Sequence, residues 1–167
     1  NIVSVLKTVV HQKTLESIVR KDLFSGLYSE EYLYGEGRKI IDQYTTSTIC
    51  MFRITNLEEI NQKYSRELGN KTITQISNHI KENISNQYVF VRYMGPKFVI
   101  AFSGVEINGV AEFLNDLKEK LEKMKITIKN KENEEEQTAL PRLNFAISTY
   151  YKGTGIEEIL KKLEEYL

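Results

Sequence analysis

The segment from Val91 to Phe98 constrains the fold of this chain more than any other stretch of its sequence. Apolar residues alternate with other residues on both sides of Gly95 and Pro96, a dipeptide that favours a tight turn. Alternation with a period of two is typical of strands that bury one face. The segment therefore predicts a β-hairpin, with one strand over residues 88–93 and the next over 97–102.

Hydrophobic periodicity places further elements on either side of this hairpin. Helices are predicted over residues 29–43, 56–66, 73–84, 107–124 and 156–167, with a chain break at Leu68-Gly69-Asn70. Apolar runs predict strands over 48–54, 125–129 and 143–150, and the polar run 130–138 is expected to be a loop. This order predicts an α+β fold, a central antiparallel sheet flanked by helices.

A narrow apolar stripe over residues 2–20 predicts an N-terminal helix, which we assign to residues 1–21, ahead of a domain over 22–167. This helix either folds back on its own domain or forms the end of a signalling coiled coil that joins two subunits. The chain opens at Asn1 inside the helical pattern, so we expect it to be a piece of a longer protein.

The composition excludes several classes of protein. The 23 basic and 23 acidic residues cancel, so no overall field favours nucleic acid or an anionic membrane, and no direct membrane contact is expected. No apolar run approaches the roughly 20 residues that cross a bilayer. The single cysteine, Cys50, excludes an internal disulfide and fits a reducing cytoplasm, the expected location. If the whole protein has a membrane anchor, this chain would be its cytoplasmic part.

The residues show no set suited to catalysis or metal binding. Neither His11 nor His79 has a second His, Cys or acid at ligand spacing, and no Ser-His-Asp set is present. We therefore expect no catalytic residues, no metal and no cofactor.

Six segments, in the same order along the chain, resemble motifs of the GGDEF domain, the diguanylate cyclase fold. They are Asp22–Leu27 for D-x-L-T-G-L, Phe52–Tyr64 for D-I-D-x-F-K-x-I-N-D-x-Y, Leu68–Asn70 for the x-G-D that follows, Arg92–Phe98 for R-Y-G-G-D-E-F, Leu143–Ser148 for T-x-S-I-G-I, and Gly155–Leu160 for the start of the last helix. The resemblance covers residues from about 22 to the end. It implies a nucleotidyl-cyclase-like sheet flanked by helices.

The departures from the family pattern bear on activity. The signature itself reads Met94, Gly95, Pro96, Lys97 and Phe98. Active members hold Mg²⁺ with the first Asp of D-I-D and an acid of the hairpin turn, and the resemblance places Arg53 and Lys97 at those positions. Since Mg²⁺ requires oxygen ligands, the resemblance implies a degenerate domain, a pseudo-enzyme without turnover.

The resemblance gives only weak support for binding of a nucleotide ligand. The family's product-inhibition motif, R-x-x-D, corresponds to Ser85 and Tyr88, so cyclic di-GMP is not expected there. The family's guanine-contacting pair corresponds to Asn61 and Asn70. Whether Asn61 and Asn70 recognise a guanine base therefore stays open.

Two interpretations of the altered site remain. Arg53 and Lys97 could contact nucleotide phosphates directly, together with amides at the helix start near Asn56, or both could have drifted after catalysis was lost. The chain is accordingly either a regulatory module that dimerises through its N-terminal helix or docks a protein partner, or a receptor for GTP or a cyclic dinucleotide. A third class, a working cyclase with unusual metal ligands, would need acids that the sequence does not show. In both cases the resemblance implies bacterial cyclic-dinucleotide signalling, such as control of biofilm formation.

Overall fold

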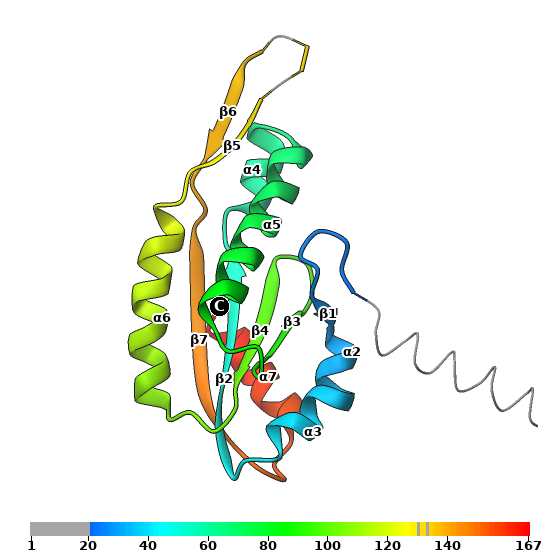
Figure 1. The fold of residues 1–167 in the computed structure, drawn as a ribbon, viewed down its shortest axis with the longest axis vertical. Helices are drawn as coiled ribbons and strands as arrows, with labels where there is room; N and C mark the ends of the chain where they lie inside the picture. The colour runs from blue at the N-terminus through cyan, green and yellow to red at the C-terminus, as the bar shows by residue number, and fades with distance from the viewer. Residues whose placement is uncertain (1–20, 130, 133) are drawn as a thin grey trace, which may run out of the picture.

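The computed structural model describes residues 21–129, 131–132 and 134–167 (Figure 1). Apart from Lys21, the predicted N-terminal helix lies outside the described residues. The elements are β1 (Tyr28–Ser29), α2 (Glu30–Tyr32), the π-helical turn η1 (Leu33–Gly37), α3 (Arg38–Ile41), β2 (Thr46–Ile54), α4 (Leu57–Lys63), α5 (Arg66–Asn83), β3 (Val89–Arg92), β4 (Lys97–Phe102), α6 (Ile107–Glu122), β5 (Ile126–Lys129), β6 (Glu136–Ala139), β7 (Leu143–Tyr151) and α7 (Ile156–Glu165).

The central sheet has five strands in the order β1-β3-β4-β2-β7. Strand β1 runs parallel to β3, and the other neighbours are antiparallel. The predicted hairpin is β3–β4, paired from Val89↔Ala101 to Arg92↔Phe98. The α+β prediction is confirmed, with one parallel pair that the sequence pattern did not indicate.

Helices cover both faces of the sheet (Figure 1). Alternate residues of β2 point to opposite faces, so Phe52 packs with residues of α5 and α6 while Met51 packs with η1 and α7. Because both faces of β2 are buried, its sequence is a nearly continuous apolar run. Cys50 is fully buried, and burial raises the pKa of its thiol, as expected for a core cysteine.

The predicted chain break at Leu68-Gly69-Asn70 is wrong. These residues lie in the first turns of α5, and the helix begins two residues earlier, after Ser65. The Ser65 hydroxyl accepts a hydrogen bond from the Leu68 amide at 3.1 Å, which caps the helix. The break lies instead at Tyr64 and Ser65, between α4 and α5.

The predicted loop over 130–138 is only partly correct. Its last three residues, 136–138, belong to β6, which pairs antiparallel with β5 from Ile126↔Ala139 to Lys129↔Glu136. Side chains of this two-stranded arm are mostly polar, so hydrophobic periodicity could not reveal the second strand. The arm extends beyond the body of the domain (Figure 1). Within the described part of the chain, no helix has the length and apolar character needed to cross a membrane.

Candidate functional site

An open cavity of about 950 Å³ lies where the β3–β4 turn, the end of β2, the Asp22–Leu27 loop and helices α4 and α5 meet. It is lined by Lys21, Asp22, Leu23, Phe24, Ser29, Arg53, Ile54, Thr55, Leu57, Glu58, Asn61, Arg66, Asn70, Ile73, Arg92, Tyr93, Gly95 and Pro96. We call it the first cavity. It brings together segments that are far apart in the sequence, including three of the resemblance motifs.

A polar clamp holds the wall of the first cavity in place. The Asp22 carboxylate accepts hydrogen bonds from the Ser25 amide at 2.9 Å, the Ser25 hydroxyl at 2.8 Å and the Arg92 guanidinium at 2.8 Å. Arg92 also donates to the carbonyl of Gly95 at 3.2 Å. The clamp therefore ties the loop over 22–27 to the hairpin turn.

Replacing Asp22 with asparagine should destabilise the fold in a pH-dependent way. Burial raises the pKa of Asp22, but the hydrogen bonds from Ser25 and Arg92 outweigh it and hold the pKa below its ordinary value. The carboxylate therefore contributes stability that is fully present above about pH 4 and is lost as the pH falls through the folded pKa. We expect the Asp22→Asn variant to be about 1 kcal/mol less stable at pH 7, since the ion pair is partly exposed.

Urea denaturation of both proteins between pH 7 and pH 2 measures this difference. The gap in free energy of unfolding should narrow at acidic pH. A gap that stays constant across this range would show that the Asp22 charge contributes nothing to stability.

The hairpin turn has the backbone that its sequence suggests. Gly95 has a φ of +56°, which favours glycine, and the Lys97 amide donates to the Met94 carbonyl at 3.0 Å. The Pro96 carbonyl accepts from the Ile54 amide at 3.0 Å, which joins the turn to the end of β2. Met94 is 53% exposed at the tip.

Arg53 and Lys97 lie opposite each other in the β2–β4 register, as the resemblance implies. Their side chains are used differently. The Lys97 ammonium pairs with the Glu164 carboxylate of α7 at 3.3 Å, and Lys97 does not line the first cavity. Arg53 does line it, and its buried Nε has no hydrogen-bond partner within the described residues. The structure thus offers Arg53, not both cations, to a ligand in this cavity.

Asn61 and Asn70 both line the first cavity. The Asn61 Oδ1 atom is buried and has no hydrogen-bond partner in the part of the chain that the structure describes. It lies against the α-carbon of Gly69, where an added Cβ would be 1.7 Å from it. Gly69 is therefore required for this position of the Asn61 side chain.

Asn56 does not take part in the first cavity. Its side-chain amide donates to the Leu140 carbonyl at 2.9 Å, and its Oδ1 accepts from the Arg142 amide at 2.8 Å. These bonds fasten the start of α4 to the segment before β7. The Asn56 side chain makes no cap hydrogen bond to α4.

The family implies Mg²⁺, and the residues present do not fit it. The first cavity is lined by two carboxylates, Asp22 and Glu58. Asp22 is taken up by the clamp, and Glu58 accepts a hydrogen bond from Gln62 at 3.3 Å. Within residues 21–129, 131–132 and 134–167, no three His, Cys, Asp or Glu side chains gather into a group that could hold a metal ion.

The structure also reveals residues that sequence reasoning missed. Arg66, at the start of α5, adds a further cation to the first cavity. A second cavity, of about 360 Å³, is lined by Lys21 and Lys81 as well as by Ser85 and Tyr88. No motif marks these lysines, because only the fold brings residues 21 and 81 together.

Solved structures with the same architecture define the class of this domain. Diguanylate cyclase SiaD of Pseudomonas aeruginosa, in complex with its activator SiaC, superposes with a TM-score of 0.78 at 9% identity, over 99% of this chain and 64% of that one. The coiled coil and GGDEF domain of DgcB from Caulobacter crescentus, in complex with c-di-GMP, gives a TM-score of 0.77 at 14% identity, over 98% and 86%.

Residues 20–167 match the family described as diguanylate cyclase, GGDEF domain. The chain therefore belongs to the GGDEF family, as the sequence motifs suggest. A curated relative, YtrP of Bacillus subtilis, is 26% identical over 93 residues, which are 56% of this chain and 16% of that protein. The chain thus spans a small part of the length of this relative.

Proposed function

We propose that this domain is a catalytically inactive GGDEF module that acts in bacterial cyclic-dinucleotide signalling through dimerisation or by docking a protein partner. The observation that carries the proposal is the charge at the family's metal positions, where Arg53 and Lys97 stand. Neither side chain supplies the oxygen ligands that Mg²⁺ requires, and the ammonium of Lys97 is already paired with Glu164. The site therefore disfavours the metal that cyclase chemistry requires.

The ion pair of Lys97 supports the same proposal. The Lys97 and Glu164 side chains are both about three-quarters shielded from solvent, with exposed fractions of 26% and 29%. Lys97 is thus part of the packing between the hairpin and α7. The position that holds an acid in active members is thus occupied by a lysine whose charge serves packing, which supports loss of the metal site.

Dimerisation and docking draw support from structural relatives. SiaD was solved with a protein activator, and DgcB was solved with its coiled coil. Both are distant in sequence, so they indicate only that this fold is compatible with such assemblies. Sedimentation of the full chain over a range of concentrations tests the dimer, and a monomer at all concentrations would leave partner docking.

The decisive test of inactivity is turnover of GTP. We expect no cyclic di-GMP and no pyrophosphate above the protein-free blank, with either Mg²⁺ or Mn²⁺, because Arg53 and Lys97 supply no carboxylate at the positions where active members hold the metal. A diguanylate cyclase such as SiaD serves as the positive control. Product that grows in proportion to the concentration of this protein would overturn the proposal.

A second candidate function is nucleotide binding without turnover. Arg53 Nε and Asn61 Oδ1 are buried and unpaired within the described residues, and both belong to residues that line the first cavity. Such atoms cost about 1–3 kcal/mol each when they stay unpaired. A guanine nucleotide in the cavity would pair with these atoms after the two side chains turn them toward it, with the base donating to Asn61 and a phosphate accepting from Arg53.

Thermal shift with GTP, ATP, cyclic di-GMP and cyclic di-AMP, each with and without Mg²⁺, tests this second candidate. A ligand at about 100 times its dissociation constant should add roughly 2.7 kcal/mol of stability. Arg53→Ala should remove the shift, whereas Lys97→Ala should keep it, because Lys97 does not line the cavity. No shift with any nucleotide would exclude the receptor.

A further inference from the structure

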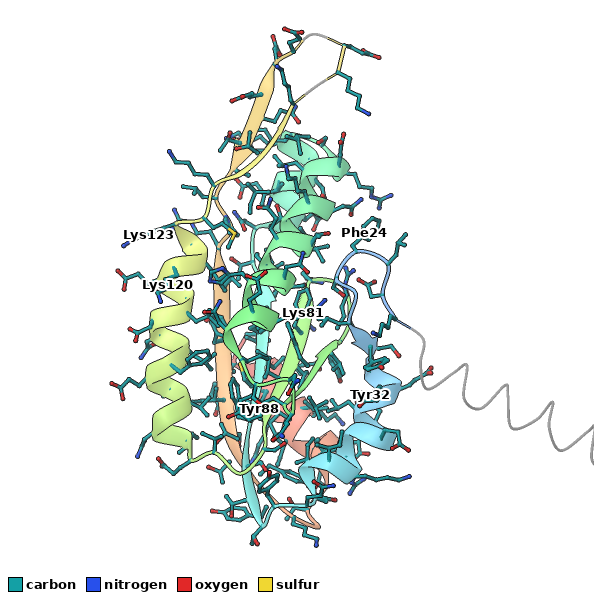
Figure 2. The ribbon with its side chains drawn as sticks, in the orientation of Figure 1. Phe24, Tyr32, Lys81, Tyr88, Lys120 and Lys123 are labelled. Carbon is teal, nitrogen blue, oxygen red and sulfur yellow. The ribbon has the colours of Figure 1, made fainter. Side chains whose placement is uncertain are left out.

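The mouth of the first cavity carries large apolar side chains that the fold leaves in solvent. Leu23 is 86% exposed and Phe24 is 39% exposed on the loop over 22–27, and both line the cavity (Figure 2). Met94 is 53% exposed at the tip of the β3–β4 turn, next to the lining residue Gly95. Apolar side chains gathered at one opening mark an interaction site, whereas scattered ones are ordinary. We call Leu23, Phe24 and Met94 the apolar rim.

Hydrogen bonds hold the apolar rim in position. The Asp22 amide donates to the Leu27 carbonyl at 2.7 Å, which closes the loop with the Leu27 side chain in the core. The Thr74 hydroxyl of α5 donates to the Phe24 carbonyl at 2.8 Å. The clamp then joins this loop to the turn that carries Met94. A surface ordered in advance loses less conformational entropy when a partner binds.

The first cavity has more cations than anions. Lys21, Arg53 and Arg66 line it, and none of the three forms an ion pair with another described residue. Of the two lining carboxylates, Asp22 is already paired in the clamp, so Glu58 alone stands against three cations. This surplus of positive charge favours an acidic occupant.

The residue types of this surface fit a protein segment better than a nucleotide. Arginine, methionine and aromatic side chains are enriched at protein interfaces. The surface offers all three types, in Arg53, Arg66, Met94 and Phe24. A nucleotide would use the cations but has no apolar side chain to cover Leu23 and Met94. The open volume of about 950 Å³ has room for several side chains of a protein segment.

We propose that the first cavity and the apolar rim dock an acidic segment of a partner protein, in which carboxylates lie beside apolar side chains. The carboxylates accept hydrogen bonds from Arg53 and Arg66, and the apolar side chains cover Leu23 and Met94. The inference rests on the proposed function, since it names the surface and the partner chemistry by which an inactive domain docks. It also makes the partner and a nucleotide competitors for one cavity.

Fluorescence anisotropy of a labelled peptide of alternating Glu and Leu residues, titrated with the full chain at low ionic strength, tests the proposal. We expect saturable binding. The same peptide with Gln in place of Glu should bind at least about tenfold more weakly, because hydrogen bonds between ionised groups are the strong ones.

Two variants of the chain locate the binding surface. Arg66→Ala should weaken binding of the Glu peptide about tenfold, the loss expected for one charge-assisted hydrogen bond. Leu23→Ser should weaken it about fivefold, because apolar contact area is lost. Both side chains are exposed, so neither change should disturb the fold. Lys120→Ala (Figure 2) and Leu140→Ser are the matched controls, exposed residues outside this cavity, and should leave affinity unchanged.

The proposal is overturned if the Glu peptide does not bind at millimolar concentration, if the Gln peptide binds as tightly, or if neither Arg66→Ala nor Leu23→Ser weakens binding. It is also overturned if GTP binds this cavity more tightly than the peptide, which would assign the cavity to a nucleotide. Failure of the proposed function is a separate result, because a domain that turns over GTP is an enzyme whether or not the peptide binds. An inactive domain that does not bind the peptide contradicts only the docking surface.

Discussion

Replacing Phe52 with alanine should lower the free energy of unfolding by about 3–5 kcal/mol. Phe52 is fully buried in the central strand β2. Its ring stacks on Phe98 at a centroid distance of 4.9 Å and contacts Phe145 at 5.1 Å and Phe90 at 6.2 Å. Truncation would leave a cavity among side chains of four strands, which the surrounding sheet cannot close without breaking its register.

Urea denaturation followed by circular dichroism measures this loss. Phe24→Ala is the matched control, because Phe24 is 39% exposed on the loop beside the first cavity (Figure 2). The control should lose well under half as much stability as Phe52→Ala. Equal losses in the two variants would show that Phe52 is not at the centre of the core.

Replacing Gly69 with alanine should cost about 1–3 kcal/mol and displace Asn61 from the first cavity. Alanine has a higher helix propensity than glycine, so a helical glycine normally tolerates the change. At Gly69 the new Cβ would lie 1.7 Å from Asn61 Oδ1 and 2.8 Å from its Cγ, distances that no contact permits. The steric clash therefore outweighs the propensity gain.

Two further variants make the prediction specific. Gly109→Ala in α6 is the matched control, since nothing lies within 4 Å of an added Cβ there, and it should stabilise the fold by up to about 1 kcal/mol. In an Asn61→Ala background, Gly69→Ala should lose its cost, because the clashing atoms are gone. A Gly69→Ala penalty that persists in this background would mean that the contact with Asn61 is not its cause.

Much of the fold could be predicted because the information is local. The Gly95-Pro96 turn, the alternation around it and the apolar run of β2 depend on neighbouring residues, and the hairpin and central strand follow from them. The start of α5 was misplaced because Gly69 was interpreted as a helix breaker. Its contact with Asn61, eight residues away, gives it a packing role inside the helix instead.

The candidate site was harder to predict, since its chemistry depends on long-range partners. Arg53 and Lys97 are register partners of β2 and β4, but the pairing of Lys97 with Glu164 crosses 67 residues of sequence. Asn56 likewise bonds across 84 and 86 residues to Leu140 and Arg142. The direction of a side chain at such positions is set by how whole helices and strands pack against one another. Hydrophobic periodicity in the sequence does not predict that packing.

The sequence by itself therefore determined the family and the central hairpin, because each depends on residue identity and local pattern, and it is the basis of our proposal that Arg53 and Lys97 replace the metal-binding acids. Tertiary structure alone decided that Arg53 lines the first cavity while Lys97 pairs with Glu164, and it alone assembled the second cavity from Lys21 and Lys81. Charges separated along the chain act together only when the sheet and its helices bring them within a few ångströms, where Coulomb interactions are strong enough to matter.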